Sequence, residues 1–148
     1  MIDQELRFEV EYGVNNEVYK DASNIRKTVF IIEQKVPKEI EVDEFENESY
    51  HIVGYLRDVP ICCARIMTEY GKFKIGRVAI LKPFRGKGIG DYLFTFTLDY
   101  LKNDLNAKEV YLNSQAQVTN FYRKHGFNTL GEPFLEANIV HIKMKKVL

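Results

Sequence analysis

A basic, glycine-rich turn in the middle of the chain sets the local order strand, turn, helix. A β-branched run from Arg77 to Ile80 enters the turn, Pro83 stops that run, and an amphipathic helix is predicted over about 88–102. Glycine backbone lets several N–H groups converge on an anion, and the N-terminus of a helix adds a favourable field. The turn therefore predicts a phosphate-binding site.

Two common phosphate-binding patterns do not fit this turn. A P-loop requires G-x-x-x-x-G-K-[ST], but a glycine follows Lys87. A dinucleotide fingerprint requires G-x-G-x-x-G, but Asp91 stands at the position of the third glycine. The motif that remains is Arg85-x-x-Gly88-x-Gly90. Taken alone, it also suits an ordinary turn with solvated basic side chains.

Composition excludes several classes of protein. Lys+Arg and Asp+Glu each number 21 in 148 residues, and this zero net charge argues against a dedicated nucleic-acid binder. No apolar run approaches the roughly 20 residues of a membrane span, and no secretory signal is visible. The adjacent Cys62 and Cys63 would point to opposite faces of a strand, which suits neither a disulfide framework nor a metal site. We interpret them as reduced thiols of a cytoplasmic protein.

Hydrophobic periodicity predicts one α/β domain with a mixed sheet over residues 1–148. Tight turns join three central strands into an antiparallel meander, and a long helix then requires the next strand to run parallel, with a right-handed crossover. The acidic run from Glu39 to Glu48 is interpreted as a solvated loop, although it could attract a cationic substrate. Strands are predicted at 6–11, 50–56, 61–68, 73–80, 109–113, 127–130 and 137–145, and helices at about 16–34, 88–102 and 115–125.

A second motif lies one strand and one helix after the glycine turn. It reads Asn120-Phe121-Tyr122-Arg123-Lys124-His125-Gly126-Phe127, an F-Y-x-K-x-G-F ending. Together with the Arg-x-x-Gly-x-Gly turn and the order of the elements, this ending resembles the GCN5-related N-acetyltransferase (GNAT) superfamily. The segment Val29 to Gln34, followed by Val36-Pro37, looks like the small bacterial branch typified by the YjcF and ElaA proteins.

The resemblance implies the acyl-CoA N-acyltransferase fold, which is a mixed, mostly antiparallel sheet of six or seven strands flanked by helices. It also implies acetyl-coenzyme A as the co-substrate, held where one parallel pair of strands splays apart, and no metal. The pyrophosphate would lie on the turn and the pantetheine along the strand before it. The implied coenzyme-binding residues are Val78, Ala79, Ile80, Arg85, Gly86, Lys87, Gly88, Ile89, Gly90, Asn113, Gln115, Asn120, Phe121, Tyr122 and Lys124.

The resemblance further implies direct transfer of the acetyl group to a primary amine of a small molecule or peptide. Tyr122 matches the tyrosine that commonly protonates the leaving thiolate, although its spacing alone would equally suit a core aromatic. Glu33, Glu41 and His51 are candidates for the general base, and a chain of waters is the alternative to all three. A non-catalytic acyl-CoA-binding sensor or interaction module on the same fold is the alternative function. The acceptor and the oligomeric state, including a homodimer, stay open.

Overall fold

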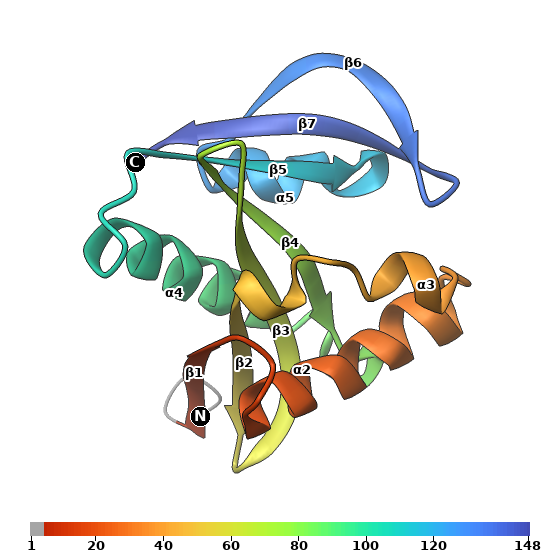
Figure 1. The fold of residues 1–148 in the computed structure, drawn as a ribbon, viewed down its shortest axis with the longest axis vertical. Coiled ribbons are helices and arrows are strands. Elements are labelled where there is room, and N and C mark those ends of the chain that lie inside the picture. The colour runs from red at the N-terminus through yellow and green to blue at the C-terminus, as the bar shows by residue number, and fades with distance from the viewer. Residues whose placement is uncertain (1–4) are drawn as a thin grey trace.

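A seven-stranded sheet with helices on both faces forms the frame of this computed structural model, which describes residues 5–148 (Figure 1). The strand order is β1-β2-β3-β4-β5-β7-β6, and every neighbouring pair is antiparallel except β4 and β5, which run parallel. This confirms the predicted fold class and the central meander. The strands are β1 (Leu6–Tyr12), β2 (Tyr50–Leu56), β3 (Val59–Glu69), β4 (Lys72–Ile80), β5 (Glu109–Gln115), β6 (Asn128–Glu136) and β7 (Ile139–Val147).

The helices are short apart from one on each face of the sheet. Among the described residues, no helix is long and apolar enough to cross a membrane. The α-helices are α2 (Glu17–Arg26), α3 (Lys38–Glu41), α4 (Ile89–Asn103) and α5 (Thr119–Lys124). The other helical turns are the π-helix η1 (Lys27–Glu33) and the 3-10 turns η2 (Glu46–Glu48), η3 (Lys82–Phe84) and η4 (Ala116–Val118).

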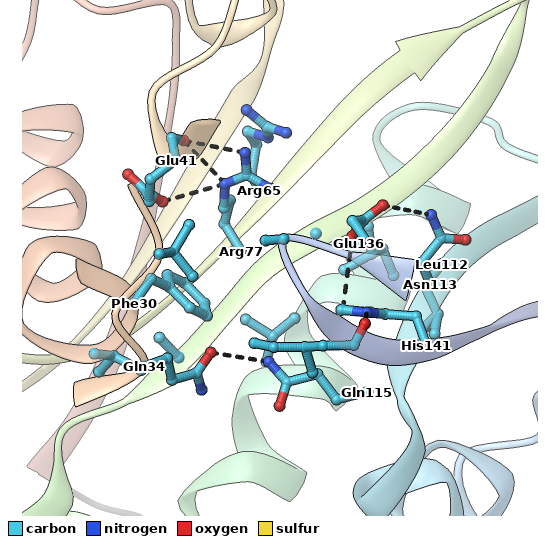
Figure 2. A pocket seen from close by; sticks show the side chains of 18 of the residues that line it. Phe30, Gln34, Glu41, Arg65, Arg77, Leu112, Asn113, Gln115, Glu136 and His141 are labelled. Atoms are coloured by element: carbon cyan, nitrogen blue, oxygen red, sulfur yellow. Dashed lines mark hydrogen bonds and ion pairs between the residues drawn. The ribbon is translucent and has the colours of Figure 1, made fainter. Parts of the chain in front are cut away.

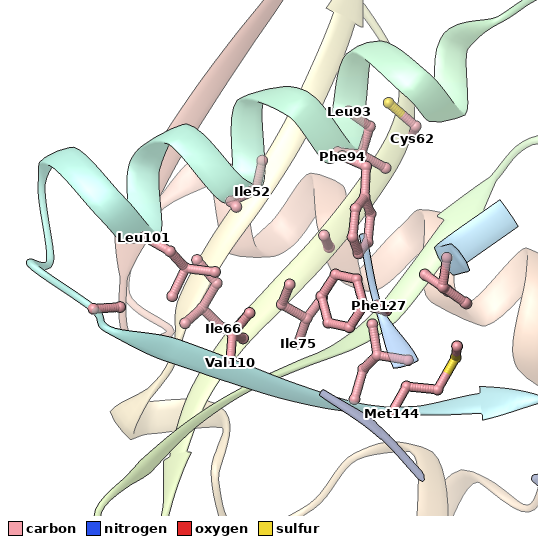
Figure 3. Packing of buried hydrophobic residues seen from close by; sticks show 14 of the residues in the cluster. Ile52, Cys62, Ile66, Ile75, Leu93, Phe94, Leu101, Val110, Phe127 and Met144 are labelled. Carbon is pink, nitrogen blue, oxygen red and sulfur yellow. The ribbon is translucent and has the colours of Figure 1, made fainter. Parts of the chain in front are cut away.

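Two hydrophobic clusters lie on opposite faces of the sheet. The larger one joins α4 and α5 to the strands around Phe94 and Phe127 (Figure 3), and the smaller one lies under α2 around Ile25. Cys62 belongs to the larger cluster and Cys63 to the smaller, and both are buried and free. The alternation predicted for this pair is confirmed. Burial raises the pKa of the Cys62 thiol to about 12, so it is an unreactive part of the core.

The first predicted helix is only partly α-helical. It is an α-helix to Arg26 and continues as a π-helix, in which the Gln34 N–H donates to the Val29 carbonyl five residues earlier. The wider turn rotates the following side chains away from the 3.6-residue period, and Ile32 is 56% exposed where the period predicted burial. The α-helical prediction for 27–34 is therefore wrong in winding and in the burial of Ile32, whereas Val29 is buried as the period predicted.

Three boundaries near the C-terminus also differ from the prediction. The helix predicted from Gln115 begins only at Thr119, because the ladder between β5 and β7 holds the backbone extended as far as Gln115 opposite His141. The strand predicted at 127–130 continues to Glu136. Ala137 and Asn138 do not begin the last strand but form its hairpin turn, with φ of 52° and 62°.

The acidic run from Glu39 to Glu48 is solvated only in part. Glu39, Glu44 and Glu48 are exposed, whereas Glu41, Asp43 and Glu46 are held in a cluster of ion pairs. The guanidinium of Arg26, itself buried, binds the carboxylates of Glu41 and Glu46, each at 2.7 Å. Asp43 binds Arg65 at 2.8 Å and Arg77 at 3.1 Å. Three acidic and three basic groups thus balance one another, and the cluster ties the segment after η1 to β3 and β4. These carboxylates have no charge left over to attract a cation.

Candidate active site

The parallel strands β4 and β5 pair over two positions and then separate. Lys74 lies opposite Tyr111 and Ile75 opposite Leu112, after which β4 continues to Ile80 without a partner on that side. Figure 1 shows the two strands diverging from this contact. The facing edges beyond it carry backbone groups that the sheet does not use. This is the splayed parallel pair that the sequence resemblance implied.

A bulge in β4 contributes to the separation. Cys63 lies opposite Ala79 and Arg65 opposite Gly76, so two residues of β4 face one residue of β3. Arg77, in the bulge, has a left-handed φ of 51°. Such a bulge bends its strand and interrupts regular pairing. The side chain of Arg77 is held outside the sheet, because its Nε donates a hydrogen bond to the Glu41 carbonyl at 3.2 Å.

A cavity of about 580 Å³ occupies the gap and is lined from both faces of the sheet (Figure 2). Phe121 and Tyr122 of α5 reach it from one face, and Phe30 of η1 reaches it from the other. Gln34 and Gln115 bridge its two walls, since Gln115 Nε2 donates to Gln34 Oε1 at 3.0 Å. Of the coenzyme-binding candidates, those that line the cavity are Val78, Ala79, Ile80, Arg85, Gly90, Asn113, Gln115, Phe121 and Tyr122.

The glycine turn lies at one end of this cavity. Gly86 and Gly88 have φ of 75° and 79°, and nothing lies within 4 Å of where a Cβ would stand at either residue. Gly90 serves packing instead, because its Cβ would stand 3.2 Å from the ring of Phe121. The open space beside Gly86 and Gly88, at the start of α4, fits an anion bound by backbone N–H groups.

Other residues predicted to bind the coenzyme lie outside the cavity lining. Lys124 forms an ion pair with Asp91 at 2.9 Å, and Asn120 is exposed and accepts a hydrogen bond from Arg123. Lys87 is exposed on the turn, and Ile89 is buried in the core below α4. The turn and the cavity lining are thus adjacent but distinct parts of the predicted coenzyme site.

Tyr122 lies in the cavity wall with 9% of its surface exposed. Its ring packs edge-on against Phe94, with the ring centroids 5.2 Å apart. Burial raises the pKa of the Tyr122 hydroxyl to about 12. The hydroxyl therefore stays protonated at neutral pH and is a hydrogen-bond donor for a cavity ligand.

The three candidate bases are all engaged elsewhere. Glu33 binds Arg85, and Glu41 reaches the cavity wall with a carboxylate bound by Arg26 and, at 3.2 Å, by Arg77. His51 is buried in β2, where its Nε2 donates to the Glu46 carbonyl at 2.8 Å. Burial lowers the pKa of His51. None of the three offers a free proton acceptor to the cavity.

The structure adds two cavity residues that the sequence analysis did not single out. Glu136 ends β6, His141 lies in β7, and their Oε2 and Nε2 atoms are 3.6 Å apart (Figure 2). Asn113 Nδ2 donates to Glu136 Oε1 at 3.2 Å. No local motif marks this pair, because it depends on the hairpin register and on the pairing of β7 with β5. The described residues contain no cluster of three His, Cys, Asp or Glu side chains arranged for a metal.

A glycine turn at a helix start, a splayed parallel pair and a cavity between the two strands together define an acyltransferase of the GNAT fold. Comparison with known families agrees with this class. The model of the acetyltransferase (GNAT) domain matches residues 15–148, and the chain belongs to this family.

The individual relatives place the chain within the bacterial branch expected from its N-terminal half. It is 41% identical over 133 residues to the protein described as the uncharacterized N-acetyltransferase YjcF of Bacillus subtilis, covering 89% of this chain and 94% of that one. It is 33% identical over 126 residues to the protein ElaA of Escherichia coli, covering 82% of each chain.

Solved structures agree with the fold. An acyl-CoA N-acyltransferase from Pseudomonas aeruginosa superposes with a TM-score of 0.86 at 26% identity, covering 96% of this chain and 99% of that one. A GNAT family acetyltransferase from Elizabethkingia anophelis, solved with acetyl-CoA bound, superposes with a TM-score of 0.67 at 16% identity, covering 98% of this chain and 99% of that one. At that identity the second comparison supports the fold alone.

Proposed function

We propose that the protein is an N-acetyltransferase that transfers the acetyl group of acetyl-CoA to a primary amine of a small molecule or peptide. The observation that carries this proposal is the cavity between β4 and β5, which joins an unpaired strand edge to a buried tyrosine. One domain over residues 1–148 would hold both substrates in a ternary complex. The family match to residues 15–148 supports that arrangement.

The edge of β4 and the glycine turn would bind different parts of acetyl-CoA. The backbone of Val78, Ala79 and Ile80 would hydrogen-bond the pantetheine amides as an added strand does. The N–H groups of the turn around Gly88 would bind the pyrophosphate. Arg85 would add a charged hydrogen bond to the phosphate once it turns from Glu33.

The chemistry requires a neutral amine and a protonated leaving sulfur. An alkyl amine with a pKa of about 10.4 must lose a proton before its lone pair attacks the thioester carbonyl. The C–S bond then breaks, and the Tyr122 hydroxyl would protonate the sulfur. The proton released by the newly acylated nitrogen would restore that hydroxyl. General acid help of this kind is worth about 10²–10⁴-fold in rate.

Two measurements on the wild-type protein test the proposal. Isothermal titration calorimetry measures acetyl-CoA binding, and a thiol-detecting assay measures coenzyme release with a panel of primary amines. We expect binding together with amine-dependent thiol release. Binding without release by any amine would instead indicate the acyl-CoA sensor, and no binding would exclude both functions.

The cysteines bear on the cellular compartment of the protein, and its oligomeric state can be measured directly. The buried, free thiols of Cys62 and Cys63 agree with action in a reducing compartment, which we propose to be the cytoplasm. Size-exclusion chromatography with light scattering would distinguish a monomer from a homodimer.

A further inference from the structure

We propose that Glu136 and His141 form the acceptor site, which takes a cationic aliphatic primary amine. Glu136 binds the ammonium group, and His141 accepts its proton. This inference rests on the proposed acetyltransferase function and names its substrate class and its base.

The geometry of the pair calls for a third group between the two side chains. His141 Nδ1 lies 2.7 Å from the Ile139 carbonyl, and because a carbonyl only accepts, Nδ1 carries the hydrogen. With the hydrogen on Nδ1, the neutral form of the ring presents a lone pair on Nε2, and the nearest atom of Glu136 is another acceptor at 3.6 Å. That separation exceeds a hydrogen bond. An ammonium group has the N–H donors to bind both.

The other carboxylates of the cavity wall already have cationic partners. Arginines bind Glu41 and Asp43, and Glu69 lies 3.7 Å from Lys74. Within residues 5–148, Glu136 is the cavity carboxylate without a lysine or arginine partner. Its side chain is 44% exposed, so a substrate can reach it from solvent.

The charges of the cavity wall that faces His141 are paired among themselves. The facing wall contributes Arg65 and Arg77, both bound to Asp43 of the segment after α3. From its own sheet, β6 contributes Glu136, and β5 contributes the uncharged Asn113 and Gln115 (Figure 2). A cation entering the cavity therefore meets one uncompensated negative group, which is Glu136.

The ring of His141 is oriented by the sheet. His141 lies opposite Gln115 in the ladder between β5 and β7 and is only 7% exposed. Phe134 stacks against the ring at 6.1 Å with an interplanar angle of 26°. The side chain is thus held at the gap between β4 and β5, along which the donor would lie.

The apolar part of the cavity lining selects an amine with an apolar stem. Phe30, Ile40 and Ile139 contribute hydrophobic side chains to the same cavity. An aliphatic chain would bury against them, while its ammonium group stays between Glu136 and His141. This combination favours an aliphatic amine over a small polar one.

The step balances in atoms and charge. One N–H bond of the ammonium breaks, and its proton moves to His141 Nε2. The freed lone pair forms the C–N bond to the thioester carbonyl carbon. The C–S bond breaks with its electron pair on sulfur, which takes the proton of the Tyr122 hydroxyl. The acylated nitrogen then loses its second proton to the Tyr122 oxygen. His141 returns its proton to solvent after the products leave.

Paired variants test the two roles. His141→Gln should lower kcat/KM for the best aliphatic amine of the panel about 10²–10⁴-fold at pH 7, with acetyl-CoA affinity unchanged. The deficit should shrink as the pH approaches the amine's own pKa of about 10.4, where the amine needs no base. Glu136→Gln should raise KM more than tenfold, and Glu136→Asp should restore part of the loss.

Matched controls separate these roles from general damage. His125→Gln changes a histidine that binds Asp91 outside the cavity lining, and Glu132→Gln changes an exposed residue on the same hairpin. Both should keep wild-type kinetics. Aniline, already neutral at pH 7, should be acetylated equally by the wild type and by Glu136→Gln.

The outcomes distinguish this inference from the proposed function. If the wild type acetylates aliphatic amines and His141→Gln keeps the wild-type pH profile, the inference is wrong and the acetyltransferase function stands. Turnover confined to arylamines would also overturn the inference alone. A wild type inactive with every amine would overturn the function and the inference with it. If His141→Gln does not fold, the variants of the half-exposed Glu136 test the inference, and an unchanged KM for the aliphatic amine in Glu136→Gln would overturn it.

Discussion

The guanidinium of Arg85 binds both carboxylate oxygens of Glu33, at 2.9 and 3.0 Å, across 52 residues of sequence. Its Nε also donates to the Ile80 carbonyl at 2.8 Å, so the group is held at the end of β4. The pair joins a predicted phosphate ligand to a candidate base. A coenzyme phosphate must compete with Glu33 for the same N–H groups.

Glu33→Gln should therefore strengthen acetyl-CoA binding about 1.4- to fivefold. The pair is partly exposed, and exposed ion pairs are worth about 0.2–1 kcal/mol, which sets this range. Calorimetric titration measures the change. In an Arg85→Ala background the same substitution should have no effect. An equal gain in both backgrounds would show that Glu33 does not act through Arg85.

Tyr122→Phe should lower turnover about 10²-fold or more while changing acetyl-CoA affinity less than twofold. The hydroxyl is the only group removed, and the ring remains packed against Phe94. Steady-state rates and calorimetry measure the two effects. Tyr70→Phe, at an exposed hairpin tip, is the control and should behave as wild type. Unchanged turnover across the pH range would exclude the acid role.

Gly88→Ala should cost about 1 kcal/mol of stability and also weaken acetyl-CoA binding. The left-handed φ of 79° strains any Cβ, and the methyl group would enter the space proposed for the phosphate. Gly71→Ala is matched to it, with a φ of 75° and equally open surroundings in a distant hairpin. Thermal denaturation should show similar losses for both variants, whereas only Gly88→Ala should bind less coenzyme.

Acid should destabilise the fold through Glu46. Burial by itself raises the pKa of this carboxyl, but the hydrogen bond and charge of Arg26 outweigh burial and lower the pKa to about 2. Because the folded pKa lies below the unfolded value of 4.5, the contribution is complete above about pH 4.5 and is lost as the pH falls toward 2. It amounts to about 3 kcal/mol.

Urea denaturation at pH 7 and pH 3 measures this contribution. Glu46→Gln leaves Arg26 buried with one fewer negative partner and should cost about 3–5 kcal/mol at pH 7. The same variant should show a smaller loss between pH 7 and pH 3 than the wild type. Glu48→Gln, exposed in the same acidic run, should match the wild type at both values. Equal acid sensitivity of Glu46→Gln and wild type would contradict this assignment.

The order of the elements could be read from the sequence because it rests on local rules. The tight turns between short apolar segments placed β2, β3 and β4, and the glycine turn placed the start of α4 within a residue or two. Local rules failed where partners from elsewhere act on the backbone. The extended end of β5 at Gln115 depends on β7, and the π-helix after Arg26 breaks the period that predicted burial of Ile32.

The site divides along the same line. Short segments of sequence determine the local backbone conformation and the chain direction. The predicted phosphate-binding turn and Tyr122 could therefore be identified from their local motifs, without any long-range contact. The sequence does not show which charged side chains are paired, since Glu41 is neutralised by Arg26 and Arg77 only after the chain has folded. Strand register, a property of two distant segments at once, is likewise what brings Glu136 and His141 together beside the gap between β4 and β5.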